Sequence, residues 1–161
     1  TISPSEVERL SKDPDTQVIR TPGYCIDYVG FNLKKPVFQD IRVREAIAAA
    51  VDLDAIISGV YSNIGLRETA PMSSGVFGYN PNLKPYVHNV AKAKELLAAA
   101  GYPDGFKITL YTNDNKVRIK LAEVVQSQLK DAGITAEIKV LEWGTYLTAL
   151  KNGEHDLYIL G

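Results

Sequence analysis

The chain has 161 residues, of which 45% are hydrophobic and 23% are charged, as is typical of one globular domain with a substantial core. The 18 basic and 19 acidic side chains give a net charge of -1, which excludes general electrostatic attraction to nucleic acid or anionic lipid. A single cysteine, Cys25, excludes an internal disulfide and a cysteine-rich metal site.

The first third of the chain carries one helix signal and two strand signals. Ser3-Pro4 suits an N-cap and first helical position, so a helix is predicted from there to about residue 12. Residues 17–21 and 24–33 are rich in β-branched and aromatic residues and predict two strands separated by a Pro-Gly turn. They could form an antiparallel pair or serve as a connector. Apolar runs in the sequence fall far short of the roughly 20 residues that cross a bilayer, and the start shows no signal-peptide pattern. We expect both ends to be boundaries within a longer protein.

The middle of the chain predicts three helices and a long irregular segment. Apolar residues recur at helical spacing after Asp40, a plausible N-cap, and a second short helix follows to about residue 60. Residues 63–89 hold several Gly and Pro residues without periodicity, which predicts an ordered but irregular segment. Asn89 then caps a helix that Gly101 ends, since glycine is favoured just past a helix.

The last third has the most regular pattern. It predicts a strand at 106–111, a helix at 116–132, a strand at 134–141, a helix near 145–151 and a strand at 156–160. Strands that alternate with helices need crossover connections, which produce parallel strands. The predicted fold class is therefore α/β with a β-α-β-α-β unit.

Polar residues follow the first strand of this unit. In open α/β sheets, ligands bind beyond the carboxyl ends of the strands, so this segment and residues 142–144 after the next strand are the candidate site positions. The candidate ligand-binding residues are Thr112, Asn113, Asp114, Asn115 and Arg118, with Lys116 as an alternative anion-binding residue. The alternative interpretation is a solvated helix-capping loop, because Asn and Asp favour caps and turns by themselves.

The patterns of known catalytic and metal sites are missing from the sequence. His88 and His155 lack partners at metal-ligand spacing and are interpreted as surface histidines, and the sequence has no nucleophile elbow, phosphate loop or dinucleotide fingerprint. We therefore predict no catalytic residues, no metal, no cofactor and no enzymatic activity. Arg42 and Arg44 are interpreted as an ion-pair face with nearby acidic residues.

Four blocks of sequence resemble the peptide-type solute-binding proteins of ABC importers, the family 5 extracellular solute-binding proteins. They are Gly30-Phe31-Asn32 with residues 36–47, residues 51–57, residues 91–102, and residues 141–147 with Gly153-Glu154-His155-Asp156. The resemblance covers the chain from about residue 20 to its end. It implies a periplasmic-binding-protein-like lobe at residues 22–161, entered by residues 1–21 from the other lobe of a two-lobed protein.

The resemblance further implies capture of a short peptide between two lobes, for delivery to the permease subunits of an importer. The implied location is periplasmic or extracytoplasmic, with membrane contact only through the importer or a lipid anchor outside this chain. The loop at 112–118 would help to hold the peptide's carboxyl end, with Arg118 near a basic ligand-binding position of oligopeptide binders; a residue beyond Gly161 would hold the amino group. Arg42, Asp40, Trp143 and Gly101 are expected to specify packing.

Other solutes remain open on the same fold, because a fold does not determine its ligand. Oligosaccharides, nickel chelates and opines are the alternatives to peptides. A ligand-sensor domain of a regulator is an alternative of a different class, which the full reading frame would distinguish through a secretion signal or a DNA-binding helix pair.

Overall fold

The computed structural model describes residues 2–161, without the side chains of Pro4 and Ser5. Its helices are α1 (Pro4–Ser11), α2 (Ile41–Ala50), α3 (Leu53–Gly59), α4 (Val90–Ala99), α5 (Lys116–Asp131) and α6 (Trp143–Asn152), with a short 3-10 helix at Pro36–Phe38. Its strands are β1 (Tyr28–Phe31), β2 (Phe106–Asn113), β3 (Ile134–Leu141) and β4 (Leu157–Leu160).

The four strands form one sheet in the order β1-β4-β2-β3. Strand β2 is parallel to both β3 and β4, whereas the edge strand β1 is antiparallel to β4 and pairs Tyr28 with Leu160. The predicted α/β class and the β-α-β-α-β unit are therefore confirmed, and the antiparallel edge strand is an addition to the predicted parallel arrangement.

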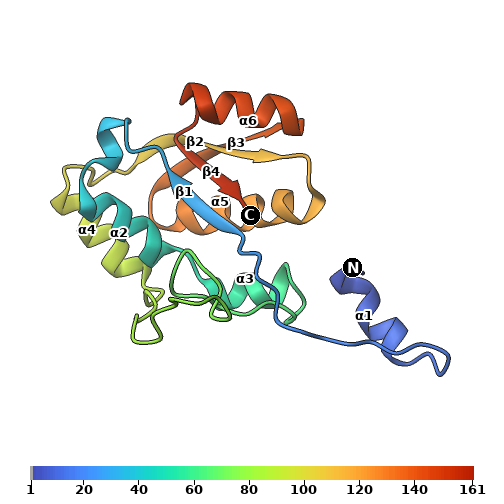
Figure 1. Cartoon of the computed structure of the whole chain (residues 1–161). Coiled ribbons are helices and arrows are strands. Elements are labelled where there is room, and N and C mark those ends of the chain that lie inside the picture. The colour runs from blue at the N-terminus through green and yellow to red at the C-terminus, as the bar shows by residue number, and fades with distance from the viewer. Residues whose placement is uncertain (1) are drawn as a thin grey trace.

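Helices cover both faces of the sheet, as Figure 1 shows: α5, α2 and α4 lie on one side and α6 lies on the other. The larger core lies between the sheet and the first group of helices, and a smaller one, around Tyr111, Tyr146 and Ala149, lies under α6. The fully buried side chains of the larger core include Phe38, Val43, Leu97, Leu110, Val125, Leu129, Ile134, Leu157 and Ile159.

Side-chain caps begin most of these helices, and two of the capping residues, Asp40 and Asn89, are the predicted ones. Asp40, Asn89 and Asn115 each accept a hydrogen bond from a backbone N–H in the first turn of the following helix. Such caps satisfy donors that a helix leaves without partners, which explains why these boundaries were predictable. The segment from 61 to 89 contains neither a helix nor a strand, as predicted.

The predicted strand at 17–21 is wrong, and the predicted strand at 24–33 is reduced to β1. Residues 15–23 form no helix or strand, and Ile19 is 74% exposed. A strand needs a neighbour for its backbone groups, and the described residues provide none for this segment. In Figure 1, α1 and the segment after it stand apart from the layered body of the chain.

Several boundaries in the last third also differ from the prediction by one or two residues. Strand β2 continues to Asn113, two residues beyond the predicted end, and α6 begins at Trp143 instead of residue 145. Strand β4 begins one residue later than predicted, at Leu157. The extension of β2 matters for the site, because it places two of the predicted loop residues inside the sheet.

Candidate functional site

The carboxyl ends of the parallel strands meet at one edge of the sheet, as the predicted site requires. Asn113 ends β2, Leu141 ends β3 and Leu160 ends β4. Because β1 runs in the opposite direction, the residues just before Tyr28 lie at this same edge. The edge therefore brings together residues from both ends of the sequence.

Arg118, near the start of α5, lies at the centre of this edge and makes three side-chain hydrogen bonds. Its Nε donates to Asp27 Oδ1 at 3.0 Å, its Nη2 donates to the Gly161 carbonyl at 2.7 Å, and its Nη1 donates to Asn113 Oδ1 at 3.3 Å. The side chain is only 15% exposed. Arg118 is therefore a fixed guanidinium at the strand ends and not an exposed arginine at a helix start.

Asp27 holds Arg118 from the opposite side and is itself held. Its second carboxylate oxygen, Oδ2, accepts a hydrogen bond from the Tyr61 hydroxyl at 2.7 Å. Burial, followed by the Asp27 carboxylate, raises the pKa of Tyr61 well above its ordinary value, so the phenol stays protonated and donates. We call Asp27, Tyr61, Asn113, Arg118 and Gly161 the arginine corner.

The predicted site residues have different fates in the structure. Of the four besides Arg118, Asn113 is the one whose side chain bonds the Arg118 guanidinium. Asn115 caps α5 by accepting from the backbone N–H groups of Val117 and Arg118 at 2.9 and 3.2 Å, and Asp114 is exposed. Thr112 is fully buried in β2, and its hydroxyl has no hydrogen-bond partner among residues 2–161. Since successive strand residues point to opposite faces, Thr112 points away from Asn113.

Three members of the arginine corner were missed by the sequence analysis: Asp27, Tyr61 and Gly161. Asp27 reaches Arg118 across 91 residues of sequence, through an antiparallel pairing that no local pattern predicts. One signal existed, because Asp27 is the single charged residue in the apolar stretch from Tyr24 to Phe31, and charged residues in such stretches are usually paired.

The second candidate segment, residues 142–144, serves the helix that follows it. Glu142 accepts hydrogen bonds from the backbone N–H groups of Gly144 and Thr145 at 2.9 and 3.2 Å, which lowers the pKa of its carboxyl below the ordinary value. Trp143 is partly exposed and packs beside the buried Tyr146, whose hydroxyl donates to the Ile159 carbonyl at 2.5 Å. These contacts assign the segment to helix capping and packing.

One histidine contradicts the prediction of two surface histidines. His155 is 6% exposed, with its ring centroid 5.0 Å from that of Tyr158, and burial lowers its pKa below the ordinary value. It is buried because the Asn32 side chain donates to the backbone carbonyls of Gly153 and His155 and draws the α6–β4 turn against the end of β1. His88 remains partly exposed beside Asp52.

Arg42 forms an ion pair, as the sequence predicted, whereas Arg44 bonds backbone carbonyls instead of an acidic side chain. Arg42 pairs with Asp40 at 2.6 Å and also donates to the Ala99 carbonyl. Arg44 donates to the carbonyls of Phe38 and Gln39. Both guanidinium groups therefore tie α2 to its surroundings.

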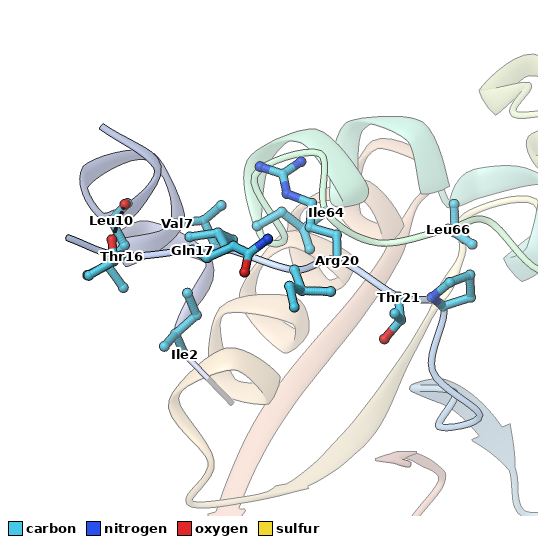
Figure 2. Close-up of a pocket in the computed structure, with 12 residues that line it drawn as sticks. Ile2, Val7, Leu10, Thr16, Gln17, Arg20, Thr21, Ile64 and Leu66 are labelled. Atoms are coloured by element: carbon cyan, nitrogen blue, oxygen red, sulfur yellow. Dashed lines mark hydrogen bonds between the residues drawn. The ribbon is translucent and has the colours of Figure 1, made fainter. Parts of the chain in front are cut away.

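A separate hollow lies away from the arginine corner, near the start of the chain. It measures about 650 Å³ and lies between α1, the segment at 16–22 and the loop that contains Ile64 and Leu66 (Figure 2). Its walls are mainly aliphatic, with Val7 and Leu10 on the α1 side. Few polar groups converge there, so it lacks the arrangement that fixes a ligand's orientation.

No three or more His, Cys, Asp or Glu side chains among residues 2–161 are grouped so that they could hold a metal ion. No helix in the same range is long and apolar enough to cross a membrane.

Comparisons with known proteins place the chain. It is 33% identical over 166 residues to the dipeptide-binding protein of Escherichia coli K12, covering 99% of this chain and 31% of that protein. The solved periplasmic binding protein DppA of Helicobacter pylori, in complex with the peptide STSA, is 36% identical, with a TM-score of 0.91 over 99% of this chain and 31% of that one. The agropinic acid complex of AgaA from A. tumefaciens R10 is 31% identical, with a TM-score of 0.86 over 99% of this chain and 33% of that one.

The chain thus spans about a third of the length of the relatives that it matches. Their structures are of the periplasmic-binding-protein fold, which agrees with the layered lobe described above. A family model matches residues 1–161, over the whole chain. On this evidence the chain belongs to the bacterial extracellular solute-binding proteins of family 5, of which it matches the middle region.

Proposed function

We propose that the chain is a ligand-binding lobe of the substrate-binding component of an ABC importer, which captures short peptides for uptake. The observation that carries the proposal is the arginine corner: a fixed guanidinium at the ligand-binding edge of an α/β sheet, in a family whose members include proteins named for dipeptide and oligopeptide binding.

The guanidinium has donors left for a ligand. An arginine side chain carries five N–H donors, and the three hydrogen bonds of Arg118 leave two. A planar pair of donors suits a carboxylate or a peptide carbonyl. In this proposal Arg118 contacts the carboxyl end of the peptide, Asn113 holds the arginine, and Asp114 lies exposed at the same strand end.

We further propose that residues 1–21 enter from a second lobe and that the peptide lies between the two lobes. Support comes from α1 and the following segment, which stand apart from the layered body in Figure 1, and from the exposed Ile19 and Tyr24. The permease subunits of an importer are the proposed partners, at a periplasmic or other extracytoplasmic location.

A second candidate is a different organic solute with an anionic or carbonyl group. It rests on relatives of similar identity that are named for other ligands: a heme-binding protein of Haemophilus influenzae, 31% identical, and the agropinic acid complex reported above. The same two arginine donors could hold a carboxylate of either ligand.

The test uses the full-length protein that carries this chain. Calorimetry with di- to pentapeptides, agropinic acid and hemin ranks the ligand classes, and mass spectrometry identifies any solute that co-purifies. Arg118→Ala should weaken peptide binding by about 2 kcal/mol or more, because the ligand group loses its partner. Arg42→Ala is the control, since Arg42 pairs with Asp40 on another helix. Peptide binding that is absent, or that is unchanged in Arg118→Ala, would refute this role.

A further inference from the structure

Within the arginine corner, the carboxylate of Asp27 already pairs with Arg118, the residue proposed to bind the ligand. Asp27 Oδ1 accepts from Arg118 Nε at 3.0 Å, and the two side chains are 29% and 15% exposed. The other members add no charge: Tyr61 is a protonated phenol, Asn113 is an amide and Gly161 contributes a carbonyl. The corner as a whole is therefore electrically neutral before any ligand arrives.

Asp27 is packed so that a ligand cannot easily take its place. The Tyr61 hydroxyl holds its Oδ2 at 2.7 Å. The backbone of Gly161 lies so close that a Cβ atom there would be 2.3 Å from Asp27 Oδ1 and 2.7 Å from the Ile26 carbonyl. Asp27 is thus fixed from three sides, by an arginine, a tyrosine and the end of β4.

We propose, resting on the peptide-binding function above, that Asp27 sets the charge preference of this corner. A ligand carboxylate on the two remaining donors of Arg118 would place two negative groups on one guanidinium, so repulsion by Asp27 offsets much of the attraction by Arg118. A neutral carbonyl oxygen uses the same donors without that repulsion. The corner therefore accepts an amide or an internal peptide carbonyl nearly as well as a free carboxylate.

The inferred substrate class follows from this preference. Peptides whose chain continues past the corner, or whose C-terminus is amidated, bind about as well as peptides that end there with a free carboxylate. Asp27 is the specificity-determining residue, because the other contacts of Arg118 are made by neutral groups.

The test compares trialanine with trialanine amide in the full-length protein by calorimetry. Wild type should prefer the acid by less than about threefold, and Asp27→Asn should raise that preference about tenfold through tighter binding of the acid, since one opposing charge is removed. Asp27→Ser, which also lacks the charge, is the second variant if Asp27→Asn does not fold. Asp40→Asn, which neutralises another arginine-paired aspartate, is the control and should leave the preference unchanged.

A probe that is independent of peptide separates this inference from the proposed function. Acetate is titrated while the Nε–H resonance of Arg118 is followed by NMR, and Asp27→Asn should bind acetate about five times more tightly than wild type, or better. Acetate discrimination without any peptide binding would refute the peptide function and keep the role of Asp27. Peptide binding with an acid preference that changes less than about fivefold in the Asp27 variants would refute the role of Asp27 and keep the function.

Discussion

Truncation of Arg118 should destabilise the fold, although an arginine near a helix start is usually dispensable. In Arg118→Ala three hydrogen bonds are lost, and one of them joins opposite charges. Hydrogen bonds to charged groups contribute about 1.5 to 3 kcal/mol, and an unpaired charge at full burial costs about 3 to 5 kcal/mol. Since Asp27 is 29% exposed and keeps its bond to Tyr61, we expect a loss of about 2 kcal/mol.

The assay is urea unfolding of the full-length protein that carries this chain, followed by circular dichroism. The matched control is Lys12→Ala, because Lys12 pairs with Glu8 while 73% of its side chain is exposed, and its loss should be undetectable. The double variant Asp27→Ala/Arg118→Ala should be more stable than Arg118→Ala, since it no longer leaves a carboxylate without its cation. A loss below about 0.5 kcal/mol in Arg118→Ala, or strictly additive effects in the double variant, would refute the reasoning.

Three further predictions concern the whole lobe. In the same urea unfolding, Gly105→Ala should lower the free energy of unfolding by about 1 to 3 kcal/mol more than Gly101→Ala. Both glycines have positive φ, but only at Gly105 would a Cβ lie 1.8 Å from the Gly133 carbonyl oxygen. Equal losses in the two variants would contradict this. The pKa of His155 lies below its ordinary value of 6.5, so its contribution to stability should be complete above pH 6.5 and be lost as the pH falls through the lowered pKa. His155→Gln should flatten this part of the profile of stability against pH. An unchanged profile would exclude His155 as the cause of the pH dependence. The isolated chain should fold but bind di- to pentapeptides with no better than micromolar affinity, because a single lobe supplies only part of the contacts. It should also leave these peptides uncleaved on prolonged incubation. Sub-micromolar binding by calorimetry would overturn the first expectation, and product peptides detected by mass spectrometry would overturn the second.

The regular part of the fold was predictable because its signals are local. The caps Asn89 and Asn115 and the buried apolar side chains of α5, which recur at helical spacing, lie within or beside the helices that they define. Strand β1 was harder, because its length depends on which residues β4 pairs with, more than 120 residues later. The segment at 17–21 has strand composition without a strand partner, so composition alone misled the prediction there.

The residues of the candidate site also divide into those with a local sequence signal and those that depend on contacts between distant segments. Arg118 and Asn113 were predicted to lie at this sheet edge because both follow directly from the strand-end rule applied to β2. Thr112 was included in error as a loop residue, since two more positions of β2 pair with β3 than the sequence predicted. Asp27 and Tyr61 could not be found from neighbouring residues, because their roles exist only once β1 lies against β4.

The antiparallel pairing of β1 with β4 has a mechanical consequence for the lobe. Backbone from before Tyr28 and backbone from after Leu160 pass the sheet edge side by side, and Arg118 is bonded to residues in both, Asp27 and Gly161. When a lobe rotates about two adjacent connecting segments, the atoms beside those segments move least and the most distant atoms move most. If the lobe rotates about these two backbone segments, we expect Arg118 to move less than residues far from this sheet edge, so that a ligand bound to it would keep its position.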